Sequence, residues 1–127
     1  MLLYEHPLSS YAQKVKIALR EKGVAFTAEL PESFGTGRTD GPFAAANPRT
    51  EVPVLIDDEA AIFDSTVILE YIEDRWPEPP LLPRTPAARA FARLTEDVCD
   101  TQYEAVMSST RILLPVEGAC TNLLSPI

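Results

Sequence analysis

Three short segments of this 127-residue chain carry the groups that could do chemistry. Ser9-Ser10-Tyr11 stands at the start of a helical pattern, Val52-Pro53 precedes an apolar run, and Asp64-Ser65 opens a second helical pattern. The edge of a strand offers backbone N–H and C=O groups to an extended chain, and a helix N-terminus attracts anions. The last two segments together suit a short, extended, charged peptide.

Elements of an α/β fold surround these segments. Apolar residues recur at helical spacing, and short apolar runs are bounded by Gly, Pro or Asp. Strands are predicted over residues 1–6, 24–30, 53–56 and 60–63, helices over 11–22 and 65–75, and a loop over 32–42. The order βαβ then ββα requires one parallel crossover and one hairpin. We therefore expect a mixed four-stranded sheet with flanking helices.

Residues 1–76 are predicted to form one compact domain. The proline-rich segment 77–86 cannot lie inside a helix and is predicted to be a stiff linker. Residues 87–106 show another helical pattern, and residues 107–127 are predicted to have no stable structure because Pro, Gly and Ser interrupt the pattern. The inner face of the 65–75 helix is expected to carry Val67, Ile68, Tyr71 and Ile72, and the apolar side of the 87–106 helix is expected to carry Phe91, Leu94, Val98 and Tyr103.

Composition narrows the classes of function. The chain has a formal net charge of −8, which disfavours nucleic acid and anionic membrane as partners. It contains no apolar run of membrane-spanning length, and its first residues lack the pattern of a signal peptide, so we expect a cytoplasmic protein. An anionic ligand would need a local cluster of hydrogen-bond donors, because the overall field repels it.

Metal and dithiol chemistry are also disfavoured. The two cysteines, Cys99 and Cys120, are far apart and belong to no CxxC motif, and His6 is the single histidine. A zinc site would have almost no ligands to draw on. We expect no metal site, and we expect His6 to pack or bond locally.

Three motifs carry a resemblance to a known family. They are Ser9 to Leu19 (SSYAQKVKIAL), Asn47-Pro48 followed by Val52-Pro53-Val54-Leu55, and Asp64 to Ile72 (DSTVILEYI). Their order and spacing closely resemble those of cytosolic glutathione S-transferases, most of all the serine-type, zeta-like bacterial members. The resemblance implies a thioredoxin-like domain that binds glutathione, followed by an all-helical domain, which is truncated here after its first helix. It also implies a homodimer.

The resemblance assigns a role to the first motif. A serine at the start of the first helix would donate a hydrogen bond to the sulfur of glutathione, and the spacing to Lys14 selects Ser9, with Ser10 and Tyr11 as alternatives. The other interpretation is that Ser9 or Ser10 only caps the helix.

It assigns the three parts of glutathione to the other segments. A cis Val52-Pro53 bond would turn the backbone of Val52 towards the cysteinyl unit, although a trans proline at the start of a strand fits the sequence equally well. Asp64 and Ser65 would hold the γ-glutamyl ammonium and carboxylate, and as a simple N-cap the pair would look the same. Arg38 would meet the glycyl carboxylate, or would simply be solvated.

The resemblance therefore implies a glutathione transferase. Glutathione is the co-substrate, and its thiol is activated for conjugation to, or isomerisation of, an electrophilic small molecule. Two alternatives remain. One is a non-catalytic binding or regulatory module of the same fold, and the other is an inactive fragment that lacks the second-substrate pocket.

Overall fold

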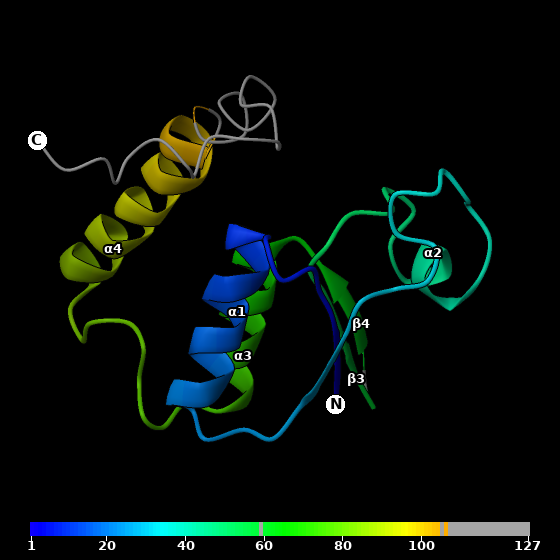
Figure 1. The fold of residues 1–127 in the computed structure, drawn as a ribbon. Coiled ribbons are helices and arrows are strands. Elements are labelled where there is room, and N and C mark those ends of the chain that lie inside the picture. The colour runs from blue at the N-terminus through cyan, green and yellow to red at the C-terminus, as the bar shows by residue number, and fades with distance from the viewer. Residues whose placement is uncertain (59, 105, 107–127) are drawn as a thin grey trace, which may run out of the picture. The chain divides into compact units, whose positions relative to one another are not determined.

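The computed structural model describes residues 1–58, 60–104 and 106, so the predictions for residues 107–127 and for Cys120 lie outside it. The chain divides into two compact units, Met1–Pro83 and a second unit that begins at Arg84. The first unit contains β1 (Leu2–Tyr4), α1 (Ser10–Glu21), β2 (Thr27–Glu29), α2 (Pro42–Ala46), β3 (Val54–Asp57), β4 (Ala60–Phe63) and α3 (Ser65–Arg75) (Figure 1). The second contains α4 (Pro86–Val98) and the π-helical segment η1 (Cys99–Tyr103).

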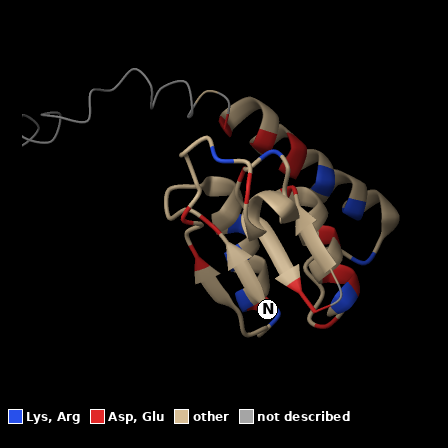
Figure 2. Cartoon of the chain, turned by 90° about the vertical axis from the view of Figure 1, so that its right-hand side faces the viewer, with Lys and Arg blue, Asp and Glu red and all other residues tan. Residues whose placement is uncertain are grey.

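The four strands form one mixed sheet in the order β2-β1-β3-β4. Strands β1 and β2 are parallel and are connected through α1, while β3 is antiparallel to both β1 and β4. The predicted mixed four-stranded sheet is confirmed. Figure 2 shows the strands almost free of charged residues, because Glu29 and Asp57 stand only at strand ends. Strands β1 and β2 are shorter than the predicted 1–6 and 24–30, although the Glu5 N–H still donates to the Glu29 carbonyl at 2.8 Å.

Helices α1 and α3 lie side by side and pack their apolar stripes against the sheet (Figure 1). The buried cluster is Leu3, Val15, Ala18, Leu19, Leu55, Ile68 and Ile72. Residues spaced three or four apart share one helix face, and Ser65, Ile68 and Ile72 form that stripe on α3. Val67, which we expected on the inner face, is 53% exposed because it lies one residue off this stripe.

The register of the strands places three strand ends next to one another at the same end of the sheet. Tyr4 pairs with Val54, and Val54 pairs with Phe63. The end of β1, the start of β3 and the end of β4 are therefore neighbours. As a consequence, the segment that leads into α1, the Val52-Pro53 bond and the first turn of α3 emerge at the same end of the sheet.

The second unit begins with a capped helix. The Thr85 hydroxyl accepts from the Ala88 N–H at 3.3 Å, and Pro86 occupies the first helical position. The expected apolar side of this helix is exposed in the described part of the chain, Phe91 by 70% and Leu94 by 58%. None of the described helices is long and apolar enough to cross a membrane.

Candidate functional site

Ser9 is the N-cap of α1. Its hydroxyl oxygen accepts a hydrogen bond from the Ala12 N–H at 3.2 Å, and its backbone is extended. A serine hydroxyl has one donor proton and two acceptor lone pairs, so capping the helix uses only a lone pair. The two interpretations of Ser9 are therefore compatible, because the O–H proton remains available to a ligand while the oxygen caps the helix.

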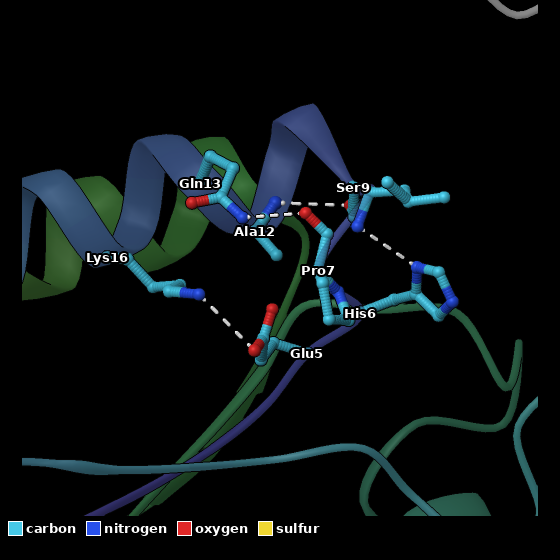
Figure 3. Close-up of polar contacts among 8 residues, drawn as sticks. Glu5, His6, Pro7, Ser9, Ala12, Gln13 and Lys16 are labelled. Atoms are coloured by element: carbon cyan, nitrogen blue, oxygen red, sulfur yellow. Dashed lines mark hydrogen bonds and ion pairs between the residues drawn. The ribbon is translucent and has the colours of Figure 1, made fainter.

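The turn before Ser9 is closed by hydrogen bonds. The Ser9 N–H donates to the His6 carbonyl at 2.9 Å. The Leu8 N–H donates to Nδ1 of His6 at 3.1 Å, the bond drawn at the imidazole in Figure 3. Nε2 of Gln13 donates to the Pro7 carbonyl at 2.9 Å. The half-buried Ser9 is thus held between the end of β1 and the first turn of α1.

The two alternative residues share the same helix start. Ser10 is the first residue of α1 and is exposed, whereas Tyr11 is half-buried with Nζ of Lys14 5.9 Å from its ring centre. The contact with the thiol remains a prediction for all three residues.

A buried asparagine organises the loop that leads into β3. Asn47 is only 2% exposed; its Nδ2 donates to the Glu51 carbonyl at 2.8 Å, and its Oδ1 accepts from the Arg49 N–H at 2.9 Å. Thr50 takes a φ of 53°, which a β-branched residue rarely adopts. The Val52-Pro53 bond that follows is cis, as the family resemblance implied. Sequence reasoning gave Asn47 no role, although an asparagine before a proline is a recognisable turn signal.

Asp64 caps α3. Its Oδ1 accepts from the N–H groups of Thr66 at 3.0 Å and Val67 at 3.2 Å, and its φ of 74° is left-handed. Ser65, the first residue of the helix, is buried. Nζ of Lys14 lies 3.4 Å from Oγ1 of Thr66, so the N-terminal halves of α1 and α3 are in direct contact.

Two arginines of the first unit, Arg38 and Arg49, make contacts of their own. The guanidinium of Arg38 donates to both carboxylate oxygens of Asp40, at 3.0 and 2.9 Å, in an exposed loop. The hydrogen bond from Arg38 lowers the pKa of Asp40, and the same bond raises the pKa of Arg38. Arg49, to which sequence reasoning gave no role, lies 5.6 Å from the ring centre of Phe63 at the sheet edge. The structure does not bring Arg38 into contact with the other predicted site residues, and its role stays a prediction.

One ion pair lies beneath the start of α1. Nζ of Lys16 is 3.2 Å from Oε1 of Glu5, and both side chains are mostly buried (Figure 3). The contact joins the end of β1 to α1 directly below the turn that carries Ser9. Within the described residues there is no cluster of three or more His, Cys, Asp or Glu side chains that could hold a metal ion.

Comparison with known proteins identifies the family. A model described as "Glutathione S-transferase, N-terminal domain" matches residues 3–80. The chain therefore belongs to the glutathione S-transferase family, and its sheet and flanking helices are those of the thioredoxin-like N-terminal domain.

The individual relatives carry two kinds of name. A stringent starvation protein A homolog of Coxiella burnetii is 39% identical over 74% of this chain and 44% of its own length. Glutathione S-transferase Z2 of Arabidopsis thaliana is 42% identical over 64% of this chain and 36% of its own length. The chain thus spans less than half the length of either relative.

Solved structures show the same fold. A Methylobacterium radiotolerans glutathione S-transferase in complex with glutathione sulfonate matches with a TM-score of 0.73 and 34% identity, over 84% of this chain and 49% of that one. A zeta-class bacterial glutathione S-transferase described as maleyl pyruvate isomerase matches with a TM-score of 0.70 and 29% identity, over 80% of this chain and 48% of that one.

Proposed function

We propose that this chain binds glutathione at the end of the sheet where the end of β1, the start of β3 and the end of β4 lie side by side. The observation that carries the proposal is the register Tyr4–Val54–Phe63, which gathers Ser9, Val52-Pro53 and Asp64-Ser65 at one end of the domain. The family of the chain and a relative described with glutathione sulfonate support it.

Each part of the ligand meets a group of matching chemistry. The γ-glutamyl carboxylate binds at the N-terminus of α3, where Ser65 and the helix amides favour an anion. The ammonium of the same unit pairs with Asp64, whose Oδ1 already caps the helix and whose side chain is exposed. The cysteinyl backbone pairs with Val52, which lies two residues before β3 and outside the strand ladder.

The sulfur is activated by Ser9. A free thiol has a pKa of about 8.5, and lowering it by one to two pH units requires about 1.4–2.7 kcal/mol in favour of the thiolate. One hydrogen bond to a charged group contributes about 1.5–3 kcal/mol, and the N-terminus of α1 adds about 0.3–1 kcal/mol. These two contributions suffice without a general base.

The glycyl end is assigned to Arg38. To reach the carboxylate, its guanidinium must share or exchange the contact with Asp40. Because the pair is exposed, this exchange costs little, and the contact of Arg38 with the glycyl carboxylate contributes little to the affinity.

The reaction we propose is attack of the thiolate on an electrophilic small molecule. In conjugation a new S–C bond forms and the leaving group departs with its electron pair, while in isomerisation the sulfur is released again. A cytoplasmic location and a homodimer belong to the same proposal.

Calorimetry with glutathione tests the binding. Asp64→Ala should weaken binding at least about tenfold through loss of one charged contact, whereas Asp74→Ala, at an exposed acid in the last turn of the same helix, should leave it unchanged. Circular dichroism establishes that both variants are folded. A folded wild-type chain that ignores millimolar glutathione would contradict the proposal.

A non-catalytic module of the same fold is the second candidate. The observation in its favour is the 39% identity to a protein whose name refers to stringent starvation and not to a transferase. An assay of glutathione conjugation to an aromatic halide distinguishes the enzyme from the non-catalytic module. Binding without turnover, unchanged by Ser9→Ala, favours the module, and turnover that is lost in Ser9→Ala favours the enzyme.

A further inference from the structure

Helix α4 and segment η1 carry one continuous apolar stripe. Its members are spaced three, four, five and three residues apart and are between 38% and 70% exposed: Phe91, Leu94, Val98, Tyr103 and Val106. Spacings of three and four keep side chains on one face of an α-helix. The spacing of five does not, because at about 100° per residue an unbroken α-helix would turn Tyr103 about 140° away from Val98.

The π-helical segment removes this mismatch. In η1 the Glu104 N–H bonds to the Cys99 carbonyl five residues earlier, so this turn holds one residue more than a turn of α-helix. With that residue absorbed, Tyr103 lies only about 40° from Val98, as a residue four positions on does in an α-helix. Val106, three residues after Tyr103, returns to the same face. The π turn therefore continues the stripe from Phe91 to Val106.

Charges of opposite sign occupy the two halves of the same segment, as Figure 2 shows along α4. Basic residues precede Leu94 and acidic residues follow it: Arg84, Arg89 and Arg93, then Glu96, Asp97, Asp100 and Glu104. A helix N-terminus is electropositive and its C-terminus electronegative, so this order is the unfavourable one for an isolated helix. The first turn of α4 has no acidic residue and its last turn has no basic one. An oppositely directed partner would offset both the charges and the dipole.

The charge order fits a partner with the same sequence. A parallel pair of these helices would set like charges against each other, which costs energy, whereas an antiparallel pair sets each basic half against an acidic half. In an antiparallel pair centred near Thr95, Arg93 of one copy faces Asp97 of the other, because each lies two residues from the centre. Both border the stripe, since each directly precedes one of its members. Two-fold symmetry makes this contact twice.

We propose that the stripe is an interface between two copies of this chain, in which α4 and η1 of one copy pack antiparallel against the same segment of the other. Association buries apolar side chains that are exposed in the single chain. The proposal rests on the homodimer that belongs to the proposed function, and it names the surface of that dimer. It does not depend on glutathione, because the predicted site residues from Ser9 to Ser65 all lie in the first unit.

Sedimentation equilibrium of the full chain at micromolar concentrations tests the apolar contact. Leu94→Gln changes a stripe residue that is 58% exposed, and Leu30→Gln, at a leucine of the first unit that is 54% exposed, is the matched control. The dissociation constant of the dimer should rise at least about tenfold in Leu94→Gln, since both copies lose an apolar contact, and stay unchanged in Leu30→Gln. Phe91→Gln is a second variant, for use if circular dichroism shows that Leu94→Gln unfolds. An unchanged constant in the stripe variant would overturn the proposal.

Charge reversal tests the pairing across the interface. Arg93→Glu sets two acids opposite each other and Asp97→Arg sets two arginines opposite each other, so each should weaken the dimer about three- to tenfold, and more at low salt. Asp97→Arg also reduces the net negative charge, so its weakening cannot come from overall repulsion. The double variant restores opposite charges and should recover the wild-type constant. A double variant as weak as the single ones, or single variants as strong as the wild-type chain, would overturn the proposal.

Cysteine cross-linking tests the direction of the helices. In a background with Cys99→Ser and Cys120→Ser, Thr95→Cys should form an intermolecular disulfide rapidly when an oxidant is added, because it lies near the two-fold axis. Ala87→Cys should not, since the two copies of a residue eight positions from the centre are about 24 Å apart along an antiparallel pair. Equal cross-linking of both variants would indicate parallel helices and would overturn the proposal.

The outcomes separate this surface from the proposed function. A wild-type chain that stays monomeric would overturn both the homodimer and the α4 interface and would leave the stripe to a different occupant, while calorimetry still decides glutathione binding. A dimer that is unaffected by Leu94→Gln and by the charge reversals would leave the homodimer standing and overturn the α4 interface alone.

Discussion

The polar groups at the two ends of the α1–α3 helix pair differ in their burial and in how fully they are hydrogen-bonded. At the first turns, the caps Ser9 and Asp64 use part of their hydrogen-bonding capacity, and Asp64 is exposed. At the last turns, Nζ of Lys22 is fully buried and lies 2.6 Å from Oε2 of Glu73. At the end that carries Ser9 and Asp64, called the open end, hydrogen-bonding groups remain available to a ligand. At the end that carries Lys22 and Glu73, called the closed end, the charged groups are buried and paired.

The closed end also fixes the linker. The two carboxylate oxygens of Glu73 accept from the N–H groups of Leu81 at 3.0 Å and Leu82 at 3.2 Å. Burial raises the pKa of Glu73, but the bond from Lys22 and the two amide bonds lower it further, so the net pKa lies below its usual range. The contrast teaches that stability and binding are separable here, because they depend on opposite ends of the same two helices.

The largest expected effect is on stability, at the closed end. Glu73→Gln leaves the charge of Lys22 buried without a counter-charge and should lower the free energy of unfolding by about 3–5 kcal/mol. Denaturant unfolding measures this loss, with Asp74→Asn at the exposed neighbouring position as the control. A loss below about 1 kcal/mol would mean that the closed end is not what stabilises the domain.

The next effect is on the thiol, at the open end. Ser9→Ala should raise the pKa of the bound thiol by about one to two pH units, since one hydrogen bond to the thiolate is lost. It should also cost about 1 kcal/mol of stability through loss of the helix cap. Ser10→Ala is the matched control, and an equal rise in that variant would move the role from Ser9 to the helix start as a whole.

Acidification should weaken the closed end. Because the pKa of Glu73 is lower in the folded chain than in the unfolded one, its contribution to stability is complete above about pH 4.3 and is lost as the pH falls through the folded value. Asp57 acts in the same direction, since the hydrogen bond from the Tyr71 hydroxyl at 2.8 Å lowers its pKa. Denaturant unfolding between about pH 5 and pH 3 should show the difference between the wild-type chain and Glu73→Gln shrinking. A difference that stays constant over this range would contradict the assignment.

The smallest effect is expected at Arg38. Its removal in Arg38→Ala should weaken glutathione binding by no more than about two- to fivefold, because an exposed ion pair contributes little. Asp40→Asn should strengthen glutathione binding or leave it unchanged, since it frees the guanidinium of Arg38 from its ion pair. Calorimetry measures both, and tighter binding by Arg38→Ala would remove Arg38 from the site.

The sequence predicted the fold well because the relevant signals are local. Helical spacing gave the buried face of α1, and the Pro and Asp boundaries gave β3, β4 and the cap of α3. The strand ends were less accurate, because the extent of β1 and β2 depends on how long the parallel pair stays in register. The prediction that Val67 lies on the inner face of α3 was wrong, because an error of one residue in choosing the buried stripe of a helix turns a side chain towards solvent.

The sequence predicted less of the site. It pointed to Ser9, Val52-Pro53 and Asp64-Ser65 as segments, but it could not show that one serine can cap the helix and still donate. It predicted that His6 would pack or bond locally, which the contacts of His6 with Leu8 and Phe34 confirm. It could not find the contacts made by Asn47 and Arg49, because these depend on backbone groups or rings that only the folded chain brings close.

The most direct test of the account is an NMR titration of the chain with glutathione. The account predicts that the amide signals of Ser9, Val52 and Ser65 shift together in a saturable way, while those of Lys22, Glu73 and Leu82 stay in place. Shifts confined to the closed end, or no shifts at millimolar glutathione in a folded chain, would contradict it.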